Sequence, residues 1–350
     1  MTVEEAKTIK VANVMCREDS LFHTAYFFKK REQRQFVVNS HHQDIANVVE
    51  YILKGLLKKV IINMPPRYGK TEVAVINLVS HAFSLNPTAR FIHLSYSQSL
   101  VEQNSEAIKN LIKSEAYQQL FPNVRIRTKS DSKKKWATTE GGTFYATSTG
   151  GQVTGHGAGK VDDLSKISPA QIKKQNAIVA SMAVDSMFDE ILKELDEWDS
   201  IELKQDFNGA LIIDDAIKPE DADSETKRKR INERYDSTLK NRLNSRNTPQ
   251  LLIGQRTHEM DLCGHVMQMD GFTTSLEEAI ANPKLWFVLS LPAIVDEGLE
   301  TEHALWPFKH TLEELKDLQN AEPISFGRQY QQDPQPKEGY MYETFRLYGY

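Results

Sequence analysis

The chain has 350 residues, a mass of 40.0 kDa and a formal net charge of −5. Hydrophobic residues make up 40% and charged residues 26%, which excludes a wholly disordered or fibrous chain. The acidic balance argues against a protein that coats nucleic acid through bulk charge. Two cysteines, Cys16 and Cys263, cannot form a disulfide framework. Because the sequence shows no secretory signal pattern and no run of about 18 apolar residues, we expect a soluble intracellular protein of one large domain or two domains.

Helical and strand patterns alternate along the chain. The spacing predicts a helix over 43–57, a strand over 59–63, a turn over 64–71, a helix over 72–83, a strand over 91–95, an amphipathic helix over 100–120 and turns between short strands over 141–160. Further buried strands are predicted over 210–213, 250–254 and 287–291. Residues 1–35 have a mixed pattern. The alternation predicts an α/β fold with a mainly parallel central sheet.

The segment 161–206 differs from the rest of the chain. Apolar residues recur there at helical spacing between acidic ones, which predicts an acidic amphipathic helix. The apolar stripe consists of Ile178, Met182, Met187, Phe188, Ile191, Leu192, Leu195 and Trp198. This helix either packs on the chain's own sheet or serves as a lid or subunit contact. Two basic clusters, Lys129 with 133–135 and residues 227–230, are interpreted as a solvated loop and a solvated helix face.

A strand, a tight loop, Gly69-Lys70-Thr71 and an apolar helix follow one another in residues 60–83. This order is typical of a phosphate-binding loop, in which backbone N–H groups and a helix N-terminus bind phosphate oxygens. Gly69 lets the backbone approach closely, Lys70 supplies a mobile cation, and the Thr71 hydroxyl is available to Mg²⁺. The standard pattern has glycine where this chain has Met64, so the prediction also depends on the flanking strand and helix.

Two adjacent carboxylates, Asp214 and Asp215, follow the buried strand over 210–213. Neighbouring carboxylates repel, and a nearby cation relieves the repulsion. The pair therefore predicts the acidic half of an ATPase site, with Asp214 holding Mg²⁺ through water and Asp215 orienting the attacking water. Arg67, inside the loop, would lie near the γ-phosphate and offset the charge that develops during phosphoryl transfer.

In combination, these motifs resemble the ATPase domain of the large terminase subunit of tailed bacteriophages, the DNA-packaging motor. The resemblance covers about residues 20–345. The segments that carry it are MPPRYGKT (64–71), LSYS (94–97), GGQVTGHGAG (150–159), DDAIK (214–218), DADS (221–224), GQRTHEMDL (254–262) and QYQQDP (329–334). The segment over 254–262 is similar to the family's coupling motif, which senses the γ-phosphate and links hydrolysis to subdomain motion.

The resemblance implies a P-loop NTPase of the ASCE, RecA-like type, with a mainly parallel sheet flanked by helices and a small lid subdomain. The implied organisation is an N-terminal extension over 1–35, an ATPase domain over 36–294 with an insertion at about 161–206, a lid or linker over 295–340, and over 341–350 the start of a linker to a nuclease domain. Because the final residues lack a carboxylate cluster for two metals, we expect no nuclease activity from this chain.

The implied activity is that of an ATPase motor that uses ATP and Mg²⁺ to move double-stranded DNA into a procapsid. Implied partners are the portal protein, the small terminase subunit and further copies of the chain in a ring, monomeric in isolation, in the host cytoplasm at the portal vertex and without a membrane. The implied nucleotide-binding residues are Pro65, Pro66, Arg67, Tyr68, Gly69, Lys70, Thr71, Gln43 and Gln255. Arg67, Lys70 and Asp215 would act in catalysis, and Thr71 and Asp214 would hold Mg²⁺.

The chain departs from the family pattern at two functional positions. The family often has glutamate where this chain has Asp215, and many relatives have Gly-Arg-Gly where it has Gly155-His156-Gly157. A trans-acting arginine therefore cannot be assigned to position 156. The remaining basic candidates for that role are Lys160, Arg228, Arg242 and Arg246.

Two alternative functions stay open. A superfamily 2 helicase shares the phosphate loop and paired acids, but it needs a second RecA-like domain and a different acidic motif after Ile213. A nucleotide-binding docking module would assemble on the portal and hardly turn over alone. Metal binding by His41-His42, or by His258, Cys263 and His265, is not predicted because their spacing matches no common zinc pattern. The four tryptophans are interpreted as packing residues.

Overall fold

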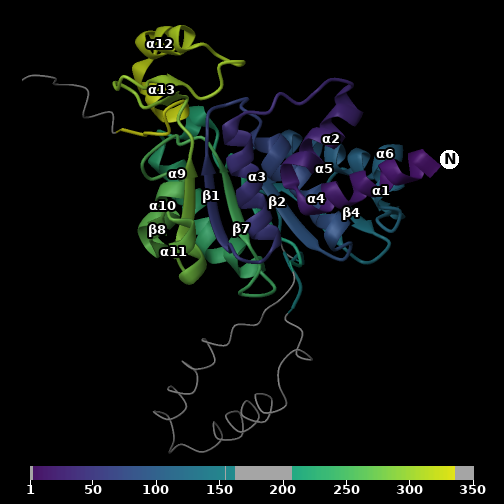
Figure 1. The fold of residues 1–350 in the computed structure, drawn as a ribbon. Coiled ribbons are helices and arrows are strands. Elements are labelled where there is room, and N and C mark those ends of the chain that lie inside the picture. The colour runs from purple at the N-terminus through teal and green to yellow at the C-terminus, as the bar shows by residue number, and fades with distance from the viewer. Residues whose placement is uncertain (1–2, 154, 162–206, 336–350) are drawn as a thin grey trace, which may run out of the picture. The chain divides into compact units, whose positions relative to one another are not determined.

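The computed structural model describes residues 3–153, 155–161 and 207–335 (Figure 1). The chain divides into two compact units, one formed by 1–160 with 207–350 and the other by 161–206. The predicted acidic helix and the predicted linker over 341–350 lie outside the described residues. No helix within the described ranges is long and apolar enough to cross a membrane.

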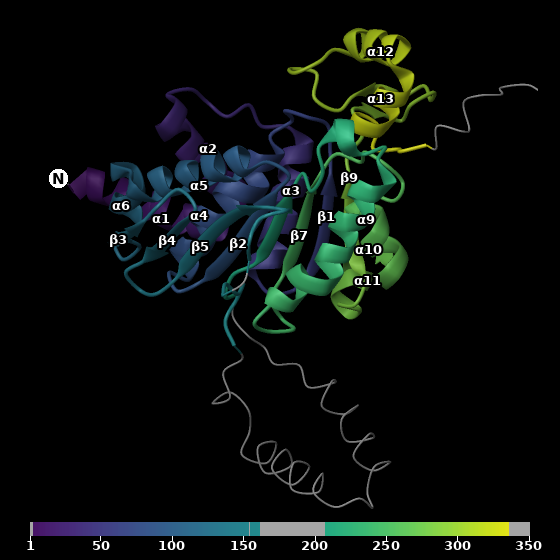
Figure 2. The ribbon, with the colours of Figure 1, turned by 180° about the vertical axis from the view of Figure 1, so that it is seen from behind.

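The first unit contains a nine-stranded sheet in the order β3-β4-β5-β2-β6-β7-β1-β9-β8 (Figures 1 and 2). The strands are β1 (Lys59–Asn63), β2 (Arg90–Ser95), β3 (Ile126–Asp131), β4 (Lys135–Thr138), β5 (Thr143–Ser148), β6 (Leu211–Asp214), β7 (Gln250–Gly254), β8 (Phe272–Thr273) and β9 (Trp286–Ser290). From β5 to β8 every neighbouring pair is parallel, whereas β4 pairs antiparallel with both β3 and β5. The predicted α/β fold with a mostly parallel sheet is thus confirmed.

The central strands are apolar because both faces of the sheet are covered. In β1, Val60 and Ile62 belong to one hydrophobic cluster and Ile61 to another, and all three have no exposed surface. Continuous apolar runs of this kind are typical of parallel strands buried on both sides. Because all the parallel strands point the same way, their carboxyl ends meet at one edge of the sheet. β7 lies between β1 and β6 in the order of strands.

Helices cover the two faces unequally. One hydrophobic cluster joins the sheet to α1 (Val3–Glu18), α2 (Ser20–Glu32), α3 (Ser40–Leu53), the π-helical stretch η1 (Glu72–Asn77), α4 (Leu78–Leu85), α5 (Gln98–Lys113), α6 (Glu115–Leu120) and α11 (Leu276–Ala281). The other cluster joins the opposite face to α9 (Glu225–Arg234) and its π-helical continuation η4 (Tyr235–Leu239), and to α10 (Leu262–Asp270). The helices of residues 1–35 therefore pack in the same core as the sheet.

Several local predictions need correction. The helix predicted over 100–120 is two helices, because Ser114 has extended backbone and its hydroxyl accepts the Tyr117 N–H to cap α6. The basic cluster over 133–135 is not a simple loop, since Lys135 begins β4 of the antiparallel hairpin. The helix predicted over 72–83 begins as a π-helix and becomes α-helical at Leu78.

The described C-terminal residues form a small subdomain with a core of its own. It contains β10 (Ile294–Val295), β11 (His303–Ala304), α12 (Leu312–Ala321) and α13 (Pro323–Gln329). Its buried apolar residues are Ala293, Ile294, Ala304, Leu315 and Phe326. We call residues 293–335 the C-terminal subdomain. It follows β9 directly, and the Leu291 N–H donates to the Asn63 carbonyl at the end of β1, 2.8 Å away.

Candidate functional site

The segment over 64–71, which we call the 64–71 loop, connects the end of β1 to η1 at the carboxyl edge of the sheet. The Met64 N–H donates to the Gly254 carbonyl at 3.1 Å, so the loop leaves the sheet beside the end of β7. Met64, which stands where the phosphate-loop pattern has glycine, is fully buried. Pro65 is also buried, whereas Arg67 is exposed. The buried Met64 side chain therefore serves as an anchor for the start of the loop.

The twin aspartates at the end of β6 meet the end of this loop. The Lys70 Nζ lies 2.6 Å from the Asp215 Oδ1, and the Lys70 side chain is only 8% exposed. The Thr71 hydroxyl donates to the Asp214 Oδ2 at 2.9 Å. The two polar pairs are adjacent, although their members are separated by 145 and 143 positions in the chain. The structure brings together four residues that the sequence assigned to one site.

The backbone of Asp215 is held in a left-handed conformation, with a φ of 49°. Its N–H donates to the Ile253 carbonyl at 2.8 Å, and its carbonyl accepts the Tyr96 N–H at 2.8 Å. The backbone N–H and carbonyl of Asp215 are therefore held by β7 and by the residue after β2. Left-handed backbone is unusual for a residue with a Cβ and is concentrated at functional sites. Here the conformation accompanies the contact between the Asp215 carboxylate and Lys70.

Asp214 is a buried carboxylate with an incomplete set of partners. It is 5% exposed, and its Oδ1 has no hydrogen-bond partner. Burial raises the pKa of Asp214 to about 6; Lys70 opposes that rise, Asp215 adds to it, and the Thr71 hydroxyl opposes it. A divalent cation beside Oδ1 would relieve both the burial of the charge and the missing contact. The Thr71 hydroxyl and the Asp214 carboxylate are oxygen ligands of the kind that Mg²⁺ prefers.

Arg67 has the freedom that a ligand-binding side chain needs. Its φ is 63°, its side chain is exposed, and it makes no hydrogen bond or ion pair to another described residue. Like Asp215, it combines left-handed backbone with a charged side chain, here at the tip of the 64–71 loop. Its guanidinium is therefore available to an anion bound by the loop.

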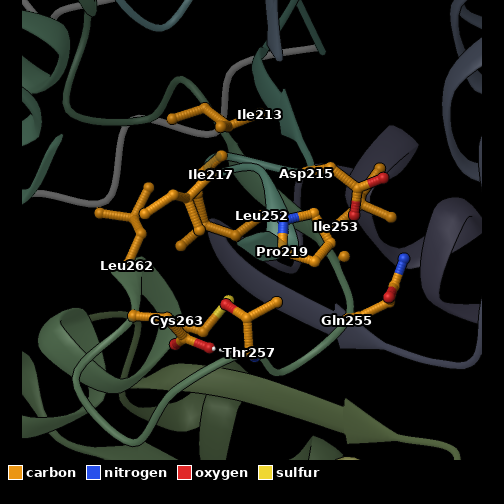
Figure 3. A pocket seen from close by; sticks show the side chains of 13 residues that line it. Ile213, Asp215, Ile217, Pro219, Leu252, Ile253, Gln255, Thr257, Leu262 and Cys263 are labelled. Carbon is orange, nitrogen blue, oxygen red and sulfur yellow. Dashed lines mark hydrogen bonds between the residues drawn. The ribbon is translucent and has the colours of Figure 1, made fainter. Parts of the chain in front are cut away.

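Gln43 and Gln255 are placed differently. Gln43, on α3, is exposed and donates to the Asn47 Oδ1 at 2.9 Å, so no contact joins it to the loop in this structure. Gln255 directly follows β7, and its Oε1 is buried without a partner. Figure 3 shows Gln255 and Asp215 on the wall of one small hollow, which is also lined by Thr257 and by apolar residues such as Leu252. Gln255 therefore lies at the site, whereas the role of Gln43 stays a prediction.

Two residues that the sequence analysis set aside, His41 and His42, contact the loop instead. Both are fully buried at the start of α3. The His41 Nε2 lies 3.2 Å from the Tyr68 carbonyl oxygen. A Cβ on Gly69 would lie 2.8 Å from the His42 Nε2, and the φ of Gly69 is 90°. Glycine is thus required at position 69 by the backbone and by the imidazole beside it. The paired histidines after Asn39 are the sequence signal for this contact, although their spacing does not show that they support the loop.

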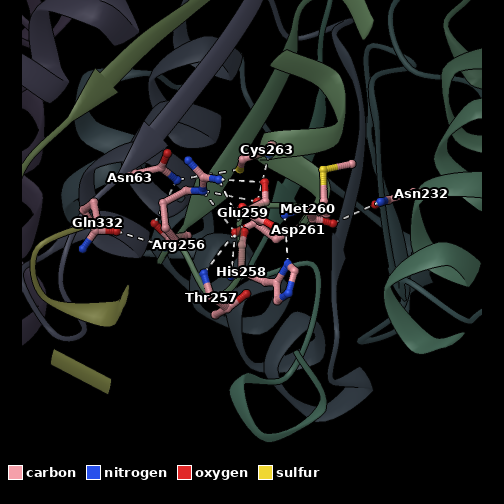
Figure 4. A network of polar contacts seen from close by, with 12 residues as sticks. Asn63, Asn232, Arg256, Thr257, His258, Glu259, Met260, Asp261, Cys263 and Gln332 are labelled. Carbon is pink, nitrogen blue, oxygen red and sulfur yellow. Dashed lines mark hydrogen bonds and ion pairs between the residues drawn. The ribbon is translucent and has the colours of Figure 1, made fainter. Parts of the chain in front are cut away.

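The residues after β7 form a polar network that reaches the C-terminal subdomain (Figure 4). The Arg256 Nε donates to both oxygens of Asp261, at 3.1 and 3.2 Å, and Asp261 caps α10 by accepting the Gly264 N–H at 2.9 Å. The backbone N–H of Arg256 donates to the Gln332 Oε1 at 3.0 Å. The Arg328 Nη1 also donates to the Asp223 carboxylate at 2.8 Å. The segments that follow β6 and β7 are therefore linked to α13 and the residues after it.

The four basic candidates for a trans-acting charge are spread over the unit. Lys160 donates to the Thr88 hydroxyl, near the amino end of β2. The Arg242 carbonyl accepts the Ala158 N–H, and Arg246 shortly precedes the amino end of β7. Arg228 lies on α9, and its Nη1 donates to the Ala222 carbonyl. Within one chain, none of the four contacts Lys70, Asp214 or Asp215 through a described hydrogen bond or ion pair.

No family model matches the chain, and no curated protein matches it.

Proposed function

We propose that this chain is a Mg²⁺-dependent ATP hydrolase with the fold of a P-loop NTPase. One observation carries the proposal: Lys70 and Thr71, the last two residues of the 64–71 loop, contact Asp215 and Asp214 at the end of β6. A cation and a hydroxyl at a helix start, opposite two carboxylates, are the groups that a nucleoside triphosphate and its metal require. Gln255 and Arg67 lie at the same edge of the sheet and add an amide and a free guanidinium.

Each side chain has a definite task in this proposal. The loop N–H groups and Lys70 bind the β- and γ-phosphates, and Arg67 offsets the charge of the γ-phosphoryl group as it is transferred. Asp215 positions the attacking water. Mg²⁺, held by Thr71 and through water by Asp214, would neutralise phosphate charge when bound. Lys70 pairs with Asp215 in this structure. In this proposal, binding of the triphosphate therefore transfers Lys70 from a carboxylate to a phosphate and frees Asp215.

We further propose that ATP hydrolysis drives packaging of double-stranded DNA into a viral procapsid. Support comes from the seven sequence segments that resemble the large terminase subunit and from the ties between the ends of β6 and β7 and the C-terminal subdomain. In this proposal the predicted lid over 295–340 moves with the γ-phosphate state. The chain acts as a ring of copies with the portal protein and the small terminase subunit, in the host cytoplasm at the portal vertex.

Steady-state ATP hydrolysis tests the enzymatic proposal. The parent chain should release phosphate only with Mg²⁺, and Lys70→Ala and Asp214→Ala should each abolish release while circular dichroism stays unchanged. Lys54→Ala is the matched control, because Lys54 is an exposed lysine at the C-cap of α3 that pairs only with Glu50. Normal turnover in Lys70→Ala or Asp214→Ala would contradict the site assignment.

A second measurement separates the motor from a docking module. The rate per chain should rise with protein concentration, since a neighbouring subunit completes the site in a ring, and duplex DNA should increase it further. A negligible rate that is flat with concentration would favour the docking module. Separation of DNA strands during hydrolysis would favour a helicase.

A further inference from the structure

Tyr68 is an unusual residue for the middle of a phosphate-binding loop. Its side chain is completely buried, although the adjacent Arg67 is exposed. Loops that enclose an anion present backbone N–H groups, so a large buried ring there needs a separate reason. The contacts at the two ends of Tyr68, its carbonyl and its hydroxyl, supply one.

The carbonyl end of Tyr68 is fixed by α3. The Asn39 Nδ2 lies 2.8 Å from the His41 Nδ1 and donates to it, which places the imidazole proton on Nε2. That Nε2–H then donates to the Tyr68 carbonyl at 3.2 Å. Burial lowers the pKa of His41 to about 4, so the ring is neutral at physiological pH and keeps this arrangement. The backbone of the 64–71 loop is therefore held by α3, a helix that packs in the hydrophobic core.

The hydroxyl of Tyr68 contacts the C-terminal subdomain. The Tyr68 hydroxyl and the His310 Nδ1 form a hydrogen bond of 3.0 Å. Trp306 closes the contact, because its ring centroid lies 5.8 Å from that of Tyr68 and 4.9 Å from that of His42. The Asn39 Nδ2 also donates to the Leu305 carbonyl at 2.7 Å. Residues 305–310 thus pack directly on the loop and on the helix that supports it.

We propose that Tyr68 is a positioning residue that couples the 64–71 loop to residues 305–310 through its hydrogen bond to His310. The inference rests on the proposed ATPase function and adds a contact between the loop and the C-terminal subdomain. It is separate from the Arg256 to Gln332 contact, which starts from β7. When phosphate binds and Lys70 leaves Asp215, a shift of the loop backbone moves the Tyr68 ring, and His310 moves with it.

Trp306 gives this coupling an intrinsic optical signal. Because it packs against Tyr68 and His42, its fluorescence should change when Mg²⁺ and a non-hydrolysable ATP analogue bind. The Trp306→Phe variant assigns the signal to this tryptophan. Tyr68→Phe keeps the buried ring and removes only the hydroxyl. Tyr330→Phe is the matched control, because the Tyr330 hydroxyl belongs to the same subdomain and makes no hydrogen bond to another described residue.

The expected result is a loss of the Trp306 response in Tyr68→Phe and in His310→Ala, with no further loss in the double variant. The KM for ATP should rise about two- to tenfold, the range of a single hydrogen bond, while thermal unfolding stays close to that of the parent. Tyr330→Phe should behave as the parent does. Non-additivity of the optical response separates coupling from a purely structural role, which would change stability without linking the two sites.

Two results would overturn the inference. If Tyr68→Phe keeps the full Trp306 response and the parent KM, or if the two single variants have additive effects, the hydroxyl does not couple the loop to residues 305–310. In both cases the parent still binds nucleotide, so the ATPase proposal survives. If the parent itself binds no nucleotide, both the ATPase proposal and this inference fail.

Discussion

Replacement of Asp214 by asparagine should stabilise the nucleotide-free protein while it abolishes hydrolysis. Asparagine keeps the size of the side chain and the oxygen that accepts the Thr71 hydroxyl. It removes a negative charge that is 95% buried. In the proposed function this charge binds Mg²⁺, so the buried charge destabilises the protein when no metal is bound.

The magnitude follows from the pKa of Asp214, which burial raises from 3.8 to about 6 in the folded chain. At about 1.4 kcal/mol per pH unit, this shift corresponds to about 3 kcal/mol of folding free energy. Well below pH 3.8 the carboxyl is protonated in both states, and the full stability is present. As the pH rises through 4 to 6, the unfolded chain ionises first, and the folded state loses about 3 kcal/mol relative to the asparagine variant.

Urea unfolding in EDTA between pH 4 and pH 8 measures this difference. The free energy of unfolding of Asp214→Asn minus that of the parent should grow with pH and become constant above about pH 7. Asp317→Asn, an exposed carboxylate on α12, is the control and should show little change. A difference for Asp214→Asn that stays constant with pH, or shrinks as the pH rises, would refute the reasoning.

Three further predictions concern the loop, the core and the Arg256 network. Gly69→Ala places a Cβ 2.8 Å from the His42 Nε2 at a φ of 90°, so calorimetry should detect no ATP binding, and parent-like affinity would contradict the described loop. Phe27→Ala empties a fully buried position among aromatic rings and should cost about 3–5 kcal/mol in urea unfolding, whereas a loss under 1 kcal/mol would mean that α2 is not part of the core. Asp261→Ala leaves Arg256 without its carboxylate and α10 without its cap, so kcat should fall more than ATP affinity; equal losses in both would argue against coupling through β7.

The sheet and the meeting of the two motifs could be predicted because they depend on strong, simple patterns. The residues over 60–62 are apolar on both faces of the sheet, and β1 has the predicted bounds of 59–63. Once two strands are parallel and close in the sheet, the residues after them share an edge, which brings Lys70 and Asp215 together. No side-chain detail was needed for this step.

Other features depend on contacts that leave little trace in a local pattern. α2 buries His23 and Ser20, which are polar and therefore do not contribute to the apolar periodicity that predicts a helix. The His23 Nε2 forms a hydrogen bond of 2.9 Å with the Ser80 hydroxyl. The β3–β4 hairpin turns at Ser-Lys-Lys without the glycine or asparagine of a common tight turn. His41 and His42 are recognisable as supports of the loop only when α3 has been placed beneath it.

A crystal structure of the chain with Mg²⁺ and a non-hydrolysable ATP analogue tests the central claim most directly. We expect the Lys70 Nζ to leave Asp215 for the phosphates and the Thr71 hydroxyl to ligate the metal at about 2.1 Å, with Asp214 in reach through a water. Nucleotide bound elsewhere on the chain, or a Lys70 that remains paired with Asp215 beside bound nucleotide, would contradict it.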